Sequence, residues 1–255
     1  MNGLRVLQIS DLHLRADPRR TLLGVDTAHS LRAVLGQAMG EARPDAVLVT
    51  GDVAHDPTEQ SYDRVRAILA EFFDGPTLCL PGNHDVAEPM GDLLQTTELV
   101  LGRWLLVALD SHVDDTPEAE VSDADFARVR DAIGCHSEHF VIVATHHPPV
   151  QVDCPWLDKD RIQNAQLLLE LLSERPSVKG MVFGHAHQVV EATYRELPLM
   201  GTPSTCFQFA PRSENFAIDT AMPGYRWLIL SPEGGVTSEV RRVQDYPLQI
   251  DLSDR

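Results

Sequence analysis

The sequence predicts an α/β protein in which short buried strands alternate with amphipathic helices. Near-continuous apolar runs rich in Val, Ile and Leu are typical of strands in a sheet that is covered on both faces. Helical periodicity separates several of these runs, and the last third of the chain instead carries a hairpin signal. The chain has 255 residues, of which 43% are hydrophobic and 23% charged, which excludes disorder and suits one large domain.

Several of the predicted strands end abruptly at a Gly, Asp, Asn or His residue. The strands cover residues 5–10, 46–50, 77–80, 104–109, 140–145 and 181–183. The first predicted helix buries a stripe at helical spacing that consists of Leu31, Val34, Leu35, Ala38, Met39 and Ala42. Another helix is predicted over residues 161–172, before Pro176, and the acidic stretch 110–125 is expected to be a surface loop.

The second helix along the chain carries its own start signal. Asp56 is the expected N-cap, Pro57 takes the first helical position and Glu59 completes a capping box. The buried face of this helix is expected to contain Tyr62, Val65, Leu69 and Phe72.

Helix signals fade from residue 189 onward. Residues 225–230 and 236–240 flank a Pro-Glu-Gly-Gly turn, which predicts a hairpin that closes a second sheet. No linker divides the sequence, so we expect a single domain over residues 1–255.

The charge balance excludes several partners. Lysine and arginine total 21 against 38 aspartate and glutamate, a net charge of −17, so we expect neither nucleic acid nor a membrane surface as a partner. The four cysteines lie far apart, the N-terminal apolar stretch is too short for a signal peptide, and no run approaches the roughly 18 apolar residues of a membrane span. We therefore expect a cytoplasmic protein.

Metal-ligating side chains follow five of the predicted strands. They are Asp11, His13, Asp52, Asn83, His84, His146, His147, His185 and His187. Ligands of α/β proteins bind in the crevice outside the carboxyl ends of the strands, so these segments can converge on one site. Imidazoles and carboxylates bind first-row divalent ions, and the absence of cysteine from the set disfavours structural zinc or an iron–sulfur cluster. Two carboxylates, one amide and at least four of the imidazoles would converge, which makes seven donors. Seven are too many for one catalytic ion with an open position, and they suit two ions that share a bridging carboxylate.

The order and spacing of these residues resemble the calcineurin-like metallophosphoesterases. The five blocks are Asp11-x-His13, Gly51-Asp52, Gly82-Asn83-His84-Asp85, His146-x-Pro148 and Gly184-His185-x-His187. One such block occurs by chance, whereas five in the family's order are specific, and they span residues 5–187. The resemblance implies a layered fold of two packed mixed β-sheets flanked by helices. It also implies two divalent metal ions, iron or manganese, although the ligands permit zinc or cobalt as well.

The resemblance also implies residue roles. The first metal would be held by Asp11, His13 and His187. The second would be held by Asn83, His146 and His185, with Asp52 as the bridge. His84 resembles the family's catalytic histidine, which is not a ligand and assists the leaving oxygen. Substrate contacts would come from His13, Asp52, Asn83, His84 and His187.

Three further segments resemble the bacterial class III 3′,5′-cyclic AMP phosphodiesterases: residues 201–209, 215–216 and 223–226. This resemblance implies hydrolysis of cyclic AMP to 5′-AMP by a metal-activated hydroxide, with residues 189–245 forming second-sheet strands and a wall of the pocket. A phosphodiesterase for a glycerophosphodiester or a 2′,3′-cyclic nucleotide is the alternative, and a non-catalytic metal-binding scaffold is a third interpretation. A monomer and a homodimer are both compatible with the sequence.

Two assignments remain open in the sequence. His146 and His147 are both candidates for one ligand position. The H-x-P pattern of the family selects His146, so His147 is expected to contact a ligand rather than the metal. Many relatives have an aspartate at the position of His55, where it orients the catalytic histidine. Here Asp56 or Asp85 could take that role, or His84 could act chiefly as a hydrogen-bond donor.

Overall fold

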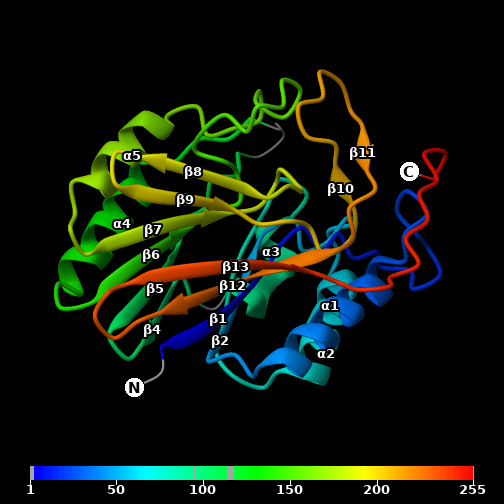
Figure 1. The fold of residues 1–255 in the computed structure, drawn as a ribbon, viewed down its shortest axis with the longest axis horizontal. Helices are drawn as coiled ribbons and strands as arrows, with labels where there is room; N and C mark the ends of the chain where they lie inside the picture. Colours follow the sequence, from blue (N-terminus) through cyan, green and yellow to red (C-terminus); the bar gives the residue numbers. More distant parts are fainter. Residues whose placement is uncertain (1–2, 95, 114–117, 255) are drawn as a thin grey trace.

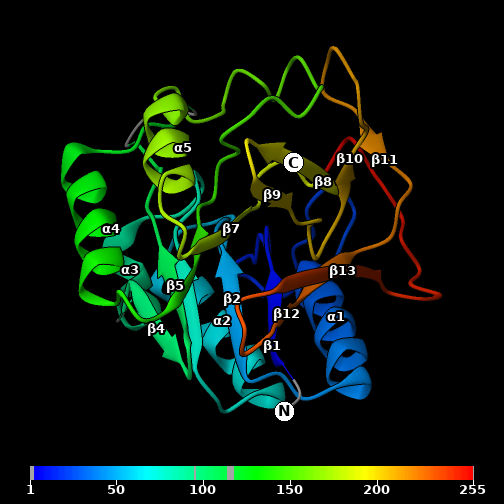
Figure 2. The ribbon, with the colours of Figure 1, turned by 60° about the vertical axis from the view of Figure 1, so that its left-hand side comes forward.

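The apolar runs form the central strands of two β-sheets that pack face to face (Figures 1 and 2). The computed structural model describes residues 3–94, 96–113 and 118–254. The first sheet has the order β13-β12-β1-β2-β3, with β1 (Leu4–Ile9), β2 (Ala46–Thr50) and β3 (Thr77–Leu80) parallel and β12 (Gly224–Leu230) and β13 (Val236–Arg242) antiparallel. The second sheet has the order β4-β5-β6-β7-β9-β8.

The second sheet is also mixed. Its parallel centre consists of β5 (Trp104–Ala108), β6 (Phe140–Ala144), β7 (Val178–Phe183) and β9 (Leu197–Gly201). Its antiparallel edges are β4 (Glu98–Leu101) and β8 (Val190–Tyr194). A separate short pair, β10 (Gln208–Phe209) and β11 (Ile218–Asp219), stands beside the sheets. The predicted α/β class with two mixed sheets and flanking helices is confirmed.

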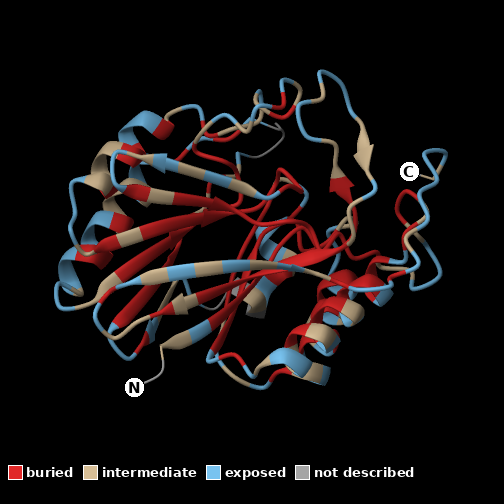
Figure 3. Ribbon diagram, viewed as in Figure 1, coloured by how far each residue is buried: buried red, intermediate tan, exposed pale blue. Residues whose placement is uncertain are grey.

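Helices cover the outer face of each sheet, so the central strands are buried on both sides (Figure 3). The first sheet is covered by α1 (Thr27–Glu41) and α2 (Glu59–Phe72), and the second by α4 (Asp123–Cys135) and α5 (Ala165–Ser173). The remaining helical turns are α3 (Ala87–Met90) and η1 (Gly91–Leu94). A third apolar cluster, with Leu48, Leu106 and Leu228 among its members, fills the space between the sheets. The single domain stays a prediction, which this shared core supports. None of the helices in the described ranges is long and apolar enough to cross a membrane.

The structure corrects the predicted place of the hairpin and the predicted acidic loop. The hairpin β12–β13 extends the first sheet rather than closing the second, because β12 pairs with β1 and is buried on both faces. Its Trp227 packs with the helices, whereas Leu228 faces the other sheet. Of the acidic stretch, Ala119 and Val121 are buried and α4 begins at Asp123, while residues 114–117 lie outside the described residues.

The start of α2 also differs from the prediction. Thr58 is the N-cap and forms the capping box with Ser61, so the helix begins two residues later than Pro57. The Asp56 carboxylate is engaged elsewhere, since it accepts hydrogen bonds from Arg15 at 2.9 Å and from the Ala16 backbone at 3.2 Å. A carboxylate held by a partly buried arginine is no longer free to cap a helix.

Arg226 on β12 joins the two sheets. Its guanidinium is fully buried and donates to the Gly201 carbonyl at 2.8 Å and the Ser238 hydroxyl at 2.7 Å. It also forms an ion pair of 2.7 Å with Glu191, so one side chain of the first sheet contacts both β8 and β9 of the second. Arg226 therefore belongs to the scaffold, and it does not line the pocket described below.

Candidate metal centre

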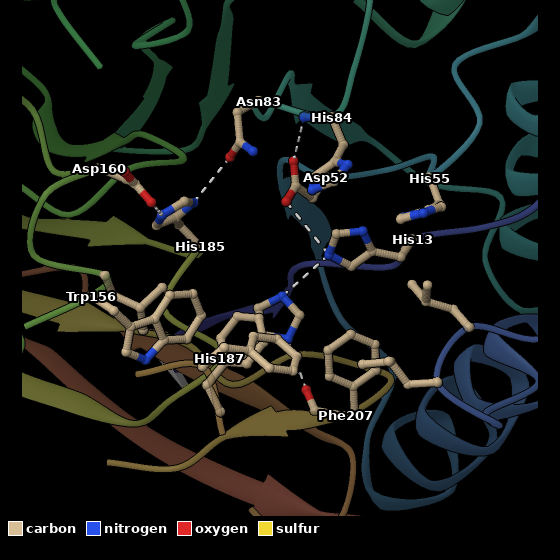
Figure 4. Close-up of a pocket in the computed structure, with 15 residues that line it drawn as sticks. His13, Asp52, His55, Asn83, His84, Trp156, Asp160, His185, His187 and Phe207 are labelled. Atoms are coloured by element: carbon tan, nitrogen blue, oxygen red, sulfur yellow. Dashed lines mark hydrogen bonds and ion pairs between the residues drawn. The ribbon is translucent and has the colours of Figure 1, made fainter. Parts of the chain in front are cut away.

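The loops that follow β1, β2, β3, β6 and β7 meet at one end of the two sheets (Figure 4). Within the first sheet Asp11 N donates to the Gly51 carbonyl at 3.0 Å, and within the second Gly184 N donates to the His146 carbonyl at 3.0 Å. The two sets of loops are joined by His185 N, which donates to Asp11 Oδ1 at 3.0 Å. The loops from both sheets therefore form one crevice, as the sequence predicts for the carboxyl ends of parallel strands.

Many of the candidate ligands have a strained backbone. Asp11, His13, Asp52, His185 and His187 have φ values of 54°, 46°, 48°, 62° and 47°. These five are half of the ten non-glycine residues with positive φ among the described residues. The left-handed region costs an L-residue on the order of 1–3 kcal/mol, and such strain concentrates at functional sites.

Four side chains form the first half of the centre. His13 Nε2 lies 3.2 Å from His187 Nε2 and 3.5 Å from Asp52 Oδ2. His187 Nε2 in turn lies 3.5 Å from Asp11 Oδ1. One ligand atom of each of these residues lies within 4.8 Å of the others, a suitable size for one ion.

The second half lies on the other side of Asp52. His146 Nε2 is 3.4 Å from Asp52 Oδ1 and 3.1 Å from Asn83 Oδ1. His185 Nδ1 is 3.0 Å from the same Asn83 oxygen. The two oxygens of Asp52 therefore face different clusters, which is the arrangement that a bridging ligand needs.

The chemistry of these donors fits two cations. His146 Nδ1 and His187 Nδ1 each lie 2.8 Å from a carbonyl oxygen, of Thr50 and Phe207, and a carbonyl can only accept. Both histidines must therefore donate from Nδ1, so that Nε2 faces the centre and offers a lone pair whenever the ring is neutral. Asp11 Oδ2 is also buried without a hydrogen-bond partner among the described residues. Acceptors that converge in this way are costly to bury unless a cation lies among them.

Three of the imidazoles are held neutral, as ligands must be. Burial lowers the pKa of His185 to about 3 and that of His187 to about 4, and it also lowers the pKa of His13 well below its ordinary value. A neutral imidazole keeps the lone pair that a metal requires.

Asp11 differs from these imidazoles. Burial, with the neighbouring Asp52 charge, raises the pKa of Asp11 to about 7, although His146 opposes the shift. Burial alone would lower the pKa of His146, but Asp52 and Asp11 raise it to about 9. In the absence of metal, His146 thus supplies positive charge to the two carboxylates, a role that a divalent ion would take over.

His84 lies beside the first half of the centre. Its backbone N–H donates to Asp52 Oδ1 at 3.0 Å, and its ring contacts His13 edge-on, with centroids 4.9 Å apart. The ring of His55 stacks on that of His84 at 5.1 Å and 26°. Neither Asp56, which binds Arg15, nor Asp85 takes the place of the family's orienting aspartate, because both carboxylates are engaged elsewhere. The stacked His55 ring is the side chain that fixes the plane of His84.

His147 lies behind the second half. Its Nδ1 is 2.9 Å from the Ser111 hydroxyl, and its ring centroid is 4.7 Å from that of His185. The atoms facing Asp52 and Asn83 belong to His146. Because His146, His147 and His185 each have a ligand atom within 4.8 Å of the others, the choice of His146 by the H-x-P pattern stays a prediction.

Asp85 holds two of the ligand-bearing loops together. Its carboxylate accepts hydrogen bonds from the backbone N–H groups of Val53, Ala54 and Gly82 at 2.9–3.0 Å and from the Tyr62 hydroxyl at 3.0 Å. The bridging aspartate and the Asn83 loop are thereby fixed to each other. This acceptor role could not be read from the G-N-H-D block alone.

We expect Asp85→Asn to destabilise the protein by about 1–3 kcal/mol, because an amide nitrogen would face buried N–H donors. Tyr62→Phe, which removes only one of these donors, should cost about 1 kcal/mol. Unfolding in urea measures both changes. Equal stability of the Asp85 variant and the wild type would show that the carboxylate does not hold the loops.

A cavity of about 490 Å³ opens above the two halves (Figure 4). Of the predicted pocket-wall segments, Phe207, Phe209 and Phe216 line it. Residues 223–226 do not, because β12 carries them into the scaffold. Sequence reasoning missed Leu22, Leu23, Trp156, Leu157 and Asp160, which come from loops without a motif. Trp156, an aromatic residue outside the predicted strands and helices, is the one signal in the sequence for this wall.

The buried histidines predict how the stability of the metal-free protein depends on pH. Burial lowers the pKa values of five histidines, which are His13, His55, His147, His185 and His187. Between the ordinary histidine pKa of about 6.5 and about pH 4, the unfolded chain protonates these five imidazoles and the folded chain does not. Groups with raised pKa values act in the opposite direction, but each of them changes the stability less over this range; they are Asp11, Asp85, Asp110, Asp160 and His146. We therefore expect the urea midpoint of chelated protein to fall from pH 7 to pH 5, and a higher midpoint at pH 5 would contradict these assignments.

Comparisons with known proteins agree with the geometry. Residues 4–189 match the model of the calcineurin-like phosphoesterases. The chain is 37% identical over 252 residues to the 3′,5′-cyclic adenosine monophosphate phosphodiesterase CpdA of Pseudomonas aeruginosa, covering 96% of this chain and 92% of that one. It is 35% identical to the protein of the same name from Escherichia coli K12, covering 98% and 94%. A dimetal phosphatase from Danio rerio has a similar fold, with a TM-score of 0.66 at 14% identity over 96% of this chain and 100% of that one. The chain belongs to the calcineurin-like phosphoesterase family.

Proposed function

We propose that the protein hydrolyses 3′,5′-cyclic AMP to 5′-AMP at a centre of two divalent metal ions. The observation that carries this proposal is the pair of acceptor clusters that share Asp52 and open into a single cavity. The substrate is taken from relatives that are named cyclic AMP phosphodiesterases and align over nearly the whole chain.

We assign the side chains as follows. Asp11, His13 and His187 would hold one ion, Asn83, His146 and His185 would hold the other, and Asp52 would be shared between them. When bound, two such ions would supply a nucleophile at neutral pH by lowering the pKa of water to about 7 and would neutralise charge on the phosphoryl oxygens. His13, Asp52, Asn83 and His187 border the phosphate position. His84, on the cavity wall, donates a hydrogen bond to the phosphoryl group and a proton to the departing 3′ oxygen.

A small diester fits the electrostatics better than a long polyanion. The net charge of −17 repels a nucleic acid that lies across the surface. Locally, two ions bring +4 against −2 from Asp11 and Asp52, which leaves a positive centre for a diester of one negative charge.

We propose iron or manganese as the native metals, because mixed imidazole and carboxylate ligands accept both. Metal analysis of gently purified protein, followed by chelation and add-back of single ions, tests this choice. Full activity after exhaustive chelation would overturn the metal-dependent mechanism.

The four cysteines are free, which suits a reducing compartment, and we propose a cytoplasmic location on that ground.

The function is tested with metal-loaded protein and a panel of 3′,5′-cyclic AMP, a 2′,3′-cyclic nucleotide, glycerophosphocholine and an aryl monoester. We expect 3′,5′-cyclic AMP to have the highest kcat/KM and 5′-AMP to be its product. Preference for one of the other diesters would identify a different phosphodiesterase, and preference for the monoester would refute diesterase activity. A metal-loaded protein that hydrolyses none of them would be a binding scaffold.

A further inference from the structure

The cavity has two chemically different ends. Seven of its fifteen described lining residues are apolar or aromatic, and they gather away from the metal ligands. We call the aromatic part of this end the aryl slot, formed by Trp156, Phe207, Phe209 and Phe216. The slot is continuous with the metal centre, because the ring of Phe209 stacks on His187 at 4.3 Å and 26°. A single ligand can therefore place its phosphate at the metal centre and another of its groups in the slot.

The slot is built of rings that support one another. Phe209 meets Trp156 edge-on, with centroids 4.9 Å apart, and Phe216 completes the cluster at 5.5 Å from Trp156 and 5.6 Å from Phe209. The side chain of Phe216 is nevertheless 44% exposed, an unusual state for a large aromatic group. Exposed ring surface beside a polar centre is what a planar ligand can cover by stacking.

None of the described side chains that form the slot offers an exposed hydrogen-bonding group to the edge of a planar ligand. All eight polar lining residues are candidate ligands or contact them, including His55, stacked on His84, and Asp160, 4.0 Å from His185 Nε2. The indole N–H of Trp156 has no hydrogen-bond partner among the described residues, but its nitrogen is buried and is therefore not accessible to a ligand in the slot. A base in the slot would therefore meet ring faces and methyl groups rather than hydrogen-bonding partners among the described lining residues.

We propose that the aryl slot binds the base of the substrate by stacking and does not discriminate between bases. This inference rests on the proposed function, since it assumes a cyclic nucleotide at the metal centre. Stacking on aromatic side chains is tolerant of base identity because every base has a π-face, whereas discrimination requires buried hydrogen-bonding groups. The substrate class is thus 3′,5′-cyclic nucleotides in general, purine and pyrimidine alike.

The first test compares 3′,5′-cyclic AMP, cyclic GMP and cyclic CMP with metal-loaded protein. We expect their kcat/KM values to lie within about tenfold of one another, as for recognition by stacking alone. Cyclic AMP hydrolysis with cyclic GMP and cyclic CMP more than about 100-fold slower would overturn the inference and leave the proposed function intact, since a ratio that large indicates edge recognition. Failure of all three, with hydrolysis of another diester, would instead refute the proposed function.

The second test uses variants of the slot. Trp156→Ala should raise KM for all three nucleotides by about tenfold with kcat little changed, and Trp156→Phe should restore most of the loss because it keeps a ring. Leu167→Ala, at an exposed residue of α5 outside the cavity, is the matched control and should have wild-type KM. An abasic 3′,5′-cyclic ribose phosphate should show the same KM with Trp156→Ala as with the wild type. Unchanged KM values for the nucleotides with Trp156→Ala would show that the base does not bind in the slot.

Discussion

Replacing His84 by alanine should lower kcat for cyclic AMP by about 10²–10⁴-fold, the usual contribution of a positioned proton donor. The ring lies on the cavity wall, in contact with His13, while only its backbone N–H binds Asp52. The substitution therefore removes the donor and keeps the hydrogen bond that orients the bridging carboxylate. Steady-state kinetics with fully metal-loaded protein measures the effect.

A second substrate separates the proton donor from a general disturbance of the centre. An aryl diester with an acidic leaving group needs little protonation, so His84→Ala should slow its hydrolysis much less than that of cyclic AMP. Metal content, measured on the same preparation, should remain at two ions per chain. If both metals are bound and kcat for cyclic AMP is unchanged, His84 does not donate the proton.

Replacing Arg226 by alanine should cost about 3–5 kcal/mol of unfolding free energy, because it removes a large buried side chain and leaves buried polar groups without their hydrogen-bond donor. The guanidinium is fully buried and binds Gly201 and Ser238 as well as Glu191. Without it, polar groups of both sheets lose their partner at the junction. Urea unfolding at pH 7 measures the difference.

The matched control for this variant is Glu191→Gln. The Glu191 side chain is 58% exposed, so water can replace its ion pair and the loss should not exceed about 1 kcal/mol. A similar loss in both variants would mean that the surface ion pair, and not the buried hydrogen bonds, joins the sheets.

The apolar strands and the ligand clusters could be predicted because their signals are local. Strand β2 and strand β3 lie where the apolar runs lie, since a strand buried on both faces leaves a continuous apolar segment. Polar residues that end such strands lie in the crevice for topological reasons, which is why Asp52 and Asn83 come together.

Pairings between distant segments could not be predicted in this way. The apolar run of β12 is equally suited to either sheet, and only its pairing with β1 determines its place. Asp56 has the composition of an N-cap, but the partner that removes it, Arg15, lies 41 residues away. The same limit applies to Trp156, which reaches the cavity from a loop without periodicity.

The left-handed backbone of the candidate ligands determines which substitutions at these positions are tolerated best in the metal-free protein. At Asp52, with φ of 48°, glycine fits the backbone at no steric cost and alanine does not, so in the metal-free state Asp52→Gly should unfold at higher urea than Asp52→Ala. At a position inside a regular strand or helix, by contrast, the alanine variant is the more stable of the two. Selection for stability alone would therefore drive these positions toward glycine, and only selection for metal binding opposes it. A lineage that no longer needed the reaction would lose its ligands first at these left-handed positions, while the strands beneath them remained intact.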